Sequence, residues 1–123
     1  MTSDAQKKAT NDIVPVDLSA EQEKLLLAAR TAHSQRAAET IYGSRETVLR
    51  HTMLAILAGA ELSEHDSPPE ATLQLLTGKV RLFGKDRSWD LVQGDLITIP
   101  PERHSLKALE DSVFILTVIR ATS

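Results

Sequence analysis

Short apolar runs, separated by turn-forming residues at regular intervals, are the feature that most constrains what this chain can fold into. Seven runs follow one another from residue 37 onward: 37–43, 45–59, 71–78, 79–84, 88–95, 96–101 and 112–120. Turn formers lie between them, as in Ser67-Pro68-Pro69 and Gly94-Asp95. Short strands with a turn about every 8 to 12 residues predict an antiparallel sandwich or barrel. No helical pattern alternates with the strands, so a doubly wound parallel sheet is not expected.

Residues 17–36, ahead of the strands, have the pattern of an amphipathic helix. Ser19 is the predicted N-cap, and Gln22 three residues later completes a capping box. Leu25 and its neighbours form an apolar stripe that can pack on the outside of the domain. Residues 1–16 are polar, mixed in charge and poor in side chains to bury, so we expect a flexible N-terminal tail.

The length and composition of the chain indicate one domain and exclude some classes of partner. A chain of 123 residues is long enough for one domain with its own core. A net charge of −3, with the basic residues scattered, gives no reason to expect binding to nucleic acid. The lack of cysteine excludes disulfides and thiolate metal sites and fits a reducing compartment. The sequence shows neither a signal-peptide pattern nor a membrane-spanning run, so we expect a cytoplasmic protein.

Two stretches, GAELSEHDSPPEATLQLLTG and GDLITIPPERHSL, resemble the two signature motifs of the cupin superfamily. In the first, Gly59, His65 and Gly78 stand at the spacings of the family motif. The resemblance covers about residues 45–120. It implies an all-β fold, the small double-sheet jelly roll or double-stranded β-helix, in which residues 37–123 form a barrel preceded by one N-terminal α-helix.

The second stretch supplies the other histidine of the resemblance. Gly94, Asp95, Pro100 and His104 match the family motif. Glu102 stands where the family usually has a glycine, and the loop is one residue tighter. Prolines cannot continue a sheet ladder, so the strand before them must end there. In cupins the histidine that follows lies across the barrel mouth from the strand that bears the first one. The resemblance therefore implies that His65 and His104 meet at the mouth.

A metal-binding cupin supplies three histidines and one carboxylate or amide, and this chain keeps only part of that set. His65 and His104 are retained, whereas Ser67 stands at the second histidine of the first motif. Ala71 stands where the family has glutamate or glutamine. The resemblance therefore implies a site with two histidines, which needs another ligand to be complete.

His51 and Glu70 are the candidates for a third metal ligand. If Ala71 faces the interior, Glu70 faces outward unless a bulge turns it in. The segment around His51 lacks clean alternation, so the sequence does not determine its face. With a third ligand the site would take a divalent transition metal such as Zn, Fe, Ni or Mn. Without one, His65 and His104 are hydrogen-bonding groups of a metal-free polar pocket, or partly buried structural residues.

The sequence leaves three hypotheses for function open, and with them whether the protein is an enzyme. The first is a cupin that binds a small molecule, with Leu73 and Leu75 lining the barrel and His65, His104 and Ser67 at its mouth. The second is a metal-dependent enzyme of the dioxygenase or isomerase type. The third is a noncatalytic regulatory or interaction protein that acts through its surface and tail. The first is favoured over the second because the metal-ligand set is incomplete.

The resemblance also implies a homodimer, because cupins of this size commonly pair through exchanged or abutting strands. The expected contacts are the apolar segment VFILTVI, residues 113–119, and Leu25 and Leu26 on the helix, since edge strands need covering. The other expected partner is the small molecule. Neither nucleic acid nor a membrane is expected.

Overall fold

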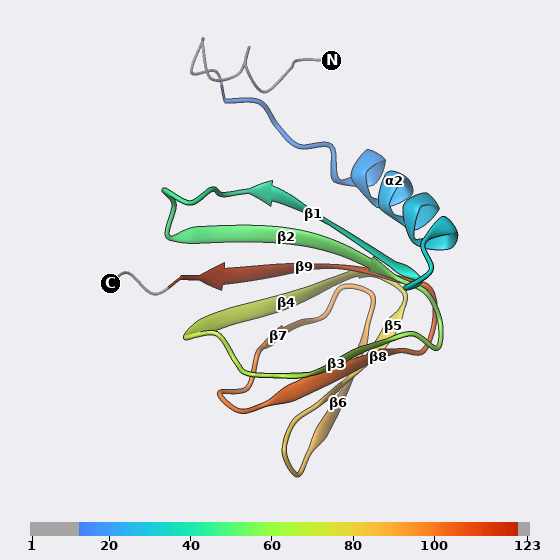
Figure 1. Cartoon of the computed structure of the whole chain (residues 1–123), viewed down its shortest axis with the longest axis vertical. Coiled ribbons are helices and arrows are strands. Elements are labelled where there is room, and N and C mark those ends of the chain that lie inside the picture. Colours follow the sequence, from blue (N-terminus) through green and yellow to red (C-terminus); the bar gives the residue numbers. More distant parts are fainter. Residues whose placement is uncertain (1–12, 121–123) are drawn as a thin grey trace.

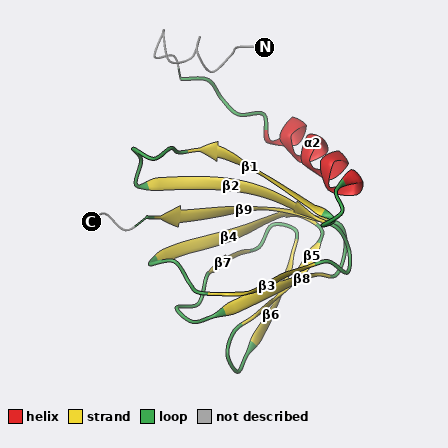
Figure 2. Cartoon of the chain, in the orientation of Figure 1, coloured by secondary structure: helices red, strands yellow, loops and turns green. Residues whose placement is uncertain are grey.

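The computed structural model describes residues 13–120 and contains, within that range, one helix followed by nine strands (Figure 2). The helix, α2, spans Leu18–Thr31. The strands are β1 (Arg36–Tyr42), β2 (Leu49–Ile56), β3 (Glu61–His65), β4 (Glu70–Thr77), β5 (Lys79–Phe83), β6 (Ser88–Val92), β7 (Leu96–Thr98), β8 (His104–Ala108) and β9 (Ser112–Ile119). The prediction of an all-β fold with one N-terminal helix is confirmed.

The strands form two antiparallel sheets that face each other (Figure 1). The larger sheet has the order β1-β2-β9-β4-β7, and the smaller sheet has the order β3-β8-β5-β6. Strands far apart in the sequence are neighbours, as where β2 pairs with β9 from Leu49↔Ile119 to Ile56↔Ser112. Two facing antiparallel sheets in which strands distant in the sequence pair with each other are typical of a jelly roll.

Strand β9 shows how alternation divides the apolar residues between the two faces of the larger sheet. Phe114 belongs to the core between the sheets, and Leu116 packs against it. Val113 and Ile115 point to the opposite face, where they pack with Leu25 and other residues of α2. The larger sheet is therefore covered by the smaller sheet on its inner face and by α2, over β1 and β2, on part of its outer face (Figure 1).

This arrangement corrects one premise of the expected dimer contacts, namely that the segment 113–119 is an edge strand. Strand β9 lies between β2 and β4, so both of its edges are already paired. Leu25 is 4% exposed and packs on the sheet, which leaves it no surface for a partner. Leu26 is partly buried against the same cluster. The homodimer itself stays a prediction.

Asp17, and not Ser19, caps helix α2. Its backbone is extended, and its carboxylate accepts a hydrogen bond from the Ala20 backbone N–H at 3.1 Å. The predicted capping box of Ser19 and Gln22 is therefore wrong. Gln22 instead accepts a hydrogen bond from the Thr77 hydroxyl at 2.8 Å, which ties the helix to the end of β4.

The N-terminal boundaries also differ from those expected. Helix α2 is shorter than the expected 17–36, because the chain turns after Thr31 and continues as β1. Of the tail expected at 1–16, residues 1–12 lie outside the described residues, and 13–16 are exposed and lack regular secondary structure. No helix in the described part of the chain has the length and apolar character needed to cross a bilayer.

The apolar pattern does not predict β3 and β8, the two strands that carry His65 and His104. Strand β3, with the sequence ELSEH, has one large apolar residue, Leu62. Strand β8, with the sequence HSLKA, is equally short. The two strands pair with each other in the smaller sheet, and their pairing builds the site.

Candidate functional site

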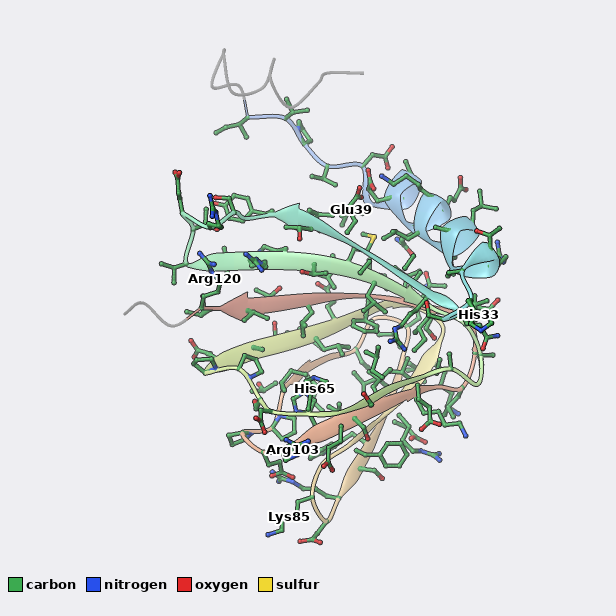
Figure 3. All side chains as sticks on the ribbon, in the orientation of Figure 1. His33, Glu39, His65, Lys85, Arg103 and Arg120 are labelled. Carbon is green, nitrogen blue, oxygen red and sulfur yellow. The ribbon has the colours of Figure 1, made fainter. Side chains whose placement is uncertain are left out.

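His65 and His104 lie directly opposite each other on the paired strands β3 and β8. The centroids of their rings are 4.3 Å apart, with an angle of 66° between the ring planes. His104 is 6% exposed, whereas His65 belongs to the exposed residues of the barrel edge. Figure 3 shows His65 in the space between the larger sheet and β8. The structure thus brings together the two imidazoles that the sequence singles out.

A β-bulge in β3 turns His65 toward the interior. Leu62 pairs with Leu106, and both pack in the core between the sheets. With regular pairing from that point, Glu64 would stand opposite His104, and His65 would point outward. The register instead shifts by one residue between Leu62 and His65, which places His65 opposite His104. The bulge therefore puts an imidazole where regular pairing would put a carboxylate.

Arg103 holds the bulged end of β3 from the outside. Its Nε lies 3.0 Å from Glu64 Oε1, and its Nη1 lies 2.7 Å from Asp66 Oδ1 (Figure 3). The hydrogen bond to Glu64, which is the larger cause, and the one to Asp66 raise the pKa of Arg103 above its ordinary value. All three side chains are exposed, so we assign the ion pairs to orientation of the strand end more than to stability.

Each imidazole donates a hydrogen bond to the backbone carbonyl two residues before it. His65 Nδ1 lies 2.9 Å from Ser63 O, and His104 Nδ1 lies 2.9 Å from Glu102 O. A carbonyl oxygen only accepts, so these bonds place a proton on Nδ1 in both rings. In the neutral ring Nε2 then carries the lone pair and accepts hydrogen bonds. With both rings neutral, the site therefore offers two acceptor nitrogens on neighbouring rings.

Glu102 fixes the loop that precedes β8. Its carboxylate accepts hydrogen bonds from Arg87 Nη2 at 2.9 Å and from the Lys85 backbone N–H at 2.7 Å. The bond from Arg87, followed by that from Lys85, lowers the pKa of Glu102 below its ordinary value. Because the Glu102 carbonyl also accepts from His104, this residue connects the β5–β6 turn to the imidazole. The glutamate that departs from the family motif thus supports the site.

A cavity of about 50 Å³ lies beside the two rings. Its apolar lining comes from both sheets, the β3–β4 loop and the start of the β7–β8 connection: Leu62, Pro68, Leu73, Leu82, Ile99, Leu106, Phe114 and Leu116. Among the described residues that line it, only His65 and His104 are polar. A space of this size admits a few waters or a small organic group, and is far below the roughly 300–1,000 Å³ of drug-sized ligand pockets.

Of the apolar residues and the serine expected to form the pocket, the structure places one at the cavity and the others away from it. Leu73 lines the cavity, whereas Leu75 is completely buried in the core and does not reach it. Ser67 also lies outside the lining, and its hydroxyl donates to the Pro68 carbonyl at 3.1 Å. Alternation along β4 correctly gives the face that Leu73 and Leu75 share, but it carries no information on where along the strand the cavity lies.

The two candidate third ligands lie on the outer face of the larger sheet. Met53 packs toward α2, and His51, two residues earlier on the same strand, shares its face. His51 Nδ1 lies 3.1 Å from the Thr117 hydroxyl on that side. Ala71 packs in the inner core, so its neighbour Glu70 faces outward. The structure brings neither residue to the cavity.

The donor set therefore does not fit a bound transition metal. Across residues 13–120, no group of three or more His, Cys, Asp or Glu side chains is placed to hold a metal ion. His65 and His104 supply two imidazole nitrogens, whereas zinc and non-haem iron sites use three or four protein ligands.

Most of the apolar lining and the bulge are missing from the sequence-based prediction. Alternation in β9 could have indicated Phe114 and Leu116, since every second residue of that strand packs inward. The bulge has no comparable signal, because it depends on how β3 pairs with a strand about forty residues away in the sequence.

The comparisons with known proteins agree with the jelly-roll topology. No protein-family model matches the sequence, and neither does any curated protein. Among solved structures, the chain is similar to a cupin superfamily protein from Desulfitobacterium hafniense, with a TM-score of 0.71 and 15% identity, over 89% of this chain and 94% of that one. It is also similar to an RmlC-like cupin protein from Desulfovibrio desulfuricans, with a TM-score of 0.60 and 20% identity, over 68% and 81% of the two chains.

A third similar structure is a conserved protein of unknown function from Streptococcus pyogenes. It has a TM-score of 0.65 and 22% identity, over 75% of this chain and 80% of that one. At such identities the likeness concerns the fold. The cupin resemblance of the two sequence motifs is confirmed at that level.

Proposed function

We propose that this cupin-fold protein binds a small organic molecule with an apolar group and one hydrogen-bond donor. The supporting observation is the paired imidazoles at an otherwise apolar cavity, each with Nδ1 bonded to the backbone. The apolar group occupies the cavity beside Leu73 and its neighbours. The donor, for example a hydroxyl, faces the Nε2 atoms of His65 and His104.

Selectivity in such a pocket comes from the imidazoles more than from the leucines. An apolar wall accepts any group of suitable size, at about 0.8 kcal/mol for each buried methylene. An acceptor that loses its water on ligand binding instead disfavours ligands that offer no donor. We therefore expect the pocket to prefer an alcohol over an ether of the same size.

The two histidines do not supply what a metal-dependent reaction needs. A dioxygenase or isomerase of the cupin type needs a complete ligand set, and within residues 13–120 the pair formed by His65 and His104 has no third member. Binding requires only the two acceptors and the apolar wall that are described above.

The test uses the full chain labelled with ¹⁵N-histidine and two isomeric probes, 1-butanol and methyl propyl ether. Only the alcohol has a donor. We expect 1-butanol to shift the Nε2 resonances of His65 and His104, and to bind several-fold more tightly than the ether. Replacement of His104 by Phe, which keeps a ring of similar shape, should remove this preference. His51→Phe, on the outer face of the larger sheet, is the matched control.

Two results would contradict the proposal. One is a titration in which 1-butanol leaves both resonances unchanged. The other is a near-stoichiometric transition metal, found by elemental analysis of protein purified without an affinity tag and lost on replacement of His65 and His104. That result would favour the metal-dependent enzyme instead.

A further inference from the structure

Arg50 is a charged residue on the inner face of the larger sheet. The pairing of β2 with β9 runs without a register shift, so alternate residues of β2 keep to one face throughout. Leu54 and Ile56 pack in or against the core between the sheets, whereas Met53 and Ala55 pack toward α2. Arg50 is an even number of positions away from Leu54 and Ile56 on the same strand, so its side chain lies on their face of the sheet and points inward.

Arg50 is not among the residues that line the cavity, and the strand register places it beyond them, toward the cavity mouth. Arg50 lies opposite Val118 and diagonal to Leu116, which lines the cavity. Diagonal neighbours in an antiparallel pair are roughly 7–8 Å apart, within reach of a long side chain. Val118 also pairs with Ala71, at the start of β4. The loop that enters β4 comes from His65, so the row that contains Arg50 lies at the same end of the barrel as His65.

Figure 3 shows at which end of the larger sheet His65 lies. Arg120 bonds to the carbonyl of Val48 and marks the end of the larger sheet at which β2 begins. In the picture Arg120 and His65 lie on the same side of the molecule, and His33 lies on the other side.

Arg50 is half-buried, and part of its guanidinium lacks a partner within residues 13–120. Its Nε atom is buried and makes no hydrogen bond. Other arginines of the barrel are paired: Arg81 with Asp90, Arg87 with Glu102, and Arg103 with Glu64 and Asp66. A buried, unsatisfied donor on a charged group is costly, and such a group calls for an explanation such as an occupant that completes its bonds.

The chemistry of the cavity mouth indicates to which chemical class such an occupant belongs. A guanidinium presents a planar fork that matches a carboxylate through two parallel bonds. One guanidinium balances one negative charge, which suits a carboxylate better than a phosphate dianion. The cavity of about 50 Å³ restricts the apolar part to a few carbon atoms. We propose that Arg50 binds the carboxylate of a short aliphatic hydroxy acid, whose chain occupies the cavity and whose hydroxyl donates to His65 and His104. This inference rests on the proposed function and names its ligand class.

The carboxylate end of this ligand class is tested with sodium butyrate against butyramide, which has the same shape and no charge. Neither probe carries the hydroxyl, so the two differ only in the group that faces Arg50, and each is titrated into the ¹⁵N-labelled full chain. Butyrate should shift the Arg50 Nε–H resonance together with the side-chain resonances of His65 and His104. It should also bind on the order of tenfold more tightly than butyramide, as expected for bonds to a charged group.

Variants separate a local role of Arg50 from a general effect of positive charge. Arg50→Gln should make butyrate and butyramide bind equally. Arg45→Gln removes the same charge from an exposed position of the β1–β2 connection and should leave the preference intact. Should Arg50→Gln fail to fold, Arg50→Lys retains the charge without the fork and should bind butyrate several-fold more weakly than the wild type.

The outcomes distinguish this inference from the proposed function. If butyramide and 1-butanol shift the two histidines and butyrate has no advantage, the inference is overturned and the proposed function stands. If butyrate shifts Arg50 and neither histidine, Arg50 binds anions outside the cavity, and the inference is again overturned. If no probe shifts either histidine, the proposed function fails, and the inference fails with it.

Discussion

Glu102 shows at the scale of one residue how the barrel edge is held. Its carboxylate binds the β5–β6 turn, and its carbonyl orients His104. A glycine at this position, as in the cupin motif, would keep the carbonyl and lose the carboxylate. We infer that this chain uses the extra side chain to fix a loop that would otherwise depend on the backbone alone.

Acid should weaken the wild type more than Glu102→Gln. The pKa of Glu102 is lowered in the folded protein, so its ionised form stabilises the fold above the ordinary glutamate range. This stabilisation is lost as the pH falls through the folded-state value. Urea unfolding at a series of pH values from about 7 to 3 measures the difference. Glu46→Gln, at an exposed position, is the control; a wild type and Glu102→Gln with parallel pH profiles would contradict the assignment.

Gly78 and Gly59 should respond differently to alanine. Both have positive φ, +94° and +88°. A Cβ at Gly78 would come 2.3 Å from Ser112 Oγ and 2.4 Å from Asp111 O, whereas one at Gly59 meets nothing within 4 Å. We expect Gly59→Ala to lower the free energy of unfolding by about 1–2 kcal/mol and Gly78→Ala by about 2–5 kcal/mol. Equal losses in urea denaturation would show that the close approach at Gly78 is not maintained.

At the scale of elements, the prediction from sequence succeeds where burial imposes a pattern. Strands β4 and β9 are long, and their alternate residues face the core, so apolar side chains mark them. The inward face of Leu73 follows from the same pattern. Strands β3 and β8 are short and rich in polar residues, because β3 is mostly exposed and β8 buries only alternate residues.

A local sequence pattern predicts neither the bulge nor the N-cap, and the reasons differ. The bulge arises from the pairing of β3 with β8, and nothing within ELSEH specifies it. The cap depends on which of two suitable residues, Asp17 or Ser19, has the extended backbone that lets its side chain bond the first turn. Both lie close to the place where the helix begins, and the sequence alone favoured the wrong one.

Asp17→Ala should destabilise the protein by about 1 kcal/mol, whereas Ser19→Ala should change stability little. The reason is that only Asp17 accepts from a free N–H of the first turn. The free energy of unfolding from urea denaturation compares the two variants directly. A larger loss for Ser19→Ala would restore the capping box that the sequence suggests.

At the scale of the whole molecule, the two sheets meet over a single apolar core and leave a small space at the edge where the histidines lie. The volume of this space restricts the possible ligands more than the type of fold does. Cupin folds take many ligands, and function follows from the residues at the site. Here the polar residues that line the cavity, within the described part of the chain, are two imidazoles, and we propose that Arg50 adds a cation at the mouth.

The homodimer is a prediction that belongs to this scale. Since β9 is enclosed, a partner strand would have to join one of the sheet edges, and β1 is the longest of the edge strands in the described structure. Sedimentation velocity of the full chain at micromolar concentration should give twice the monomer mass. A monomer at about 100 μM would contradict the prediction.

The orientation of the paired imidazoles is the claim on which the proposed function depends. Long-range ¹H–¹⁵N spectra of the histidine-labelled protein report which ring nitrogen carries the proton. At a pH where the rings are neutral, we predict the Nδ1–H tautomer for both His65 and His104, with contacts between their ring protons. The Nε2–H tautomer in either ring, or rings that show no mutual contact, would contradict the account.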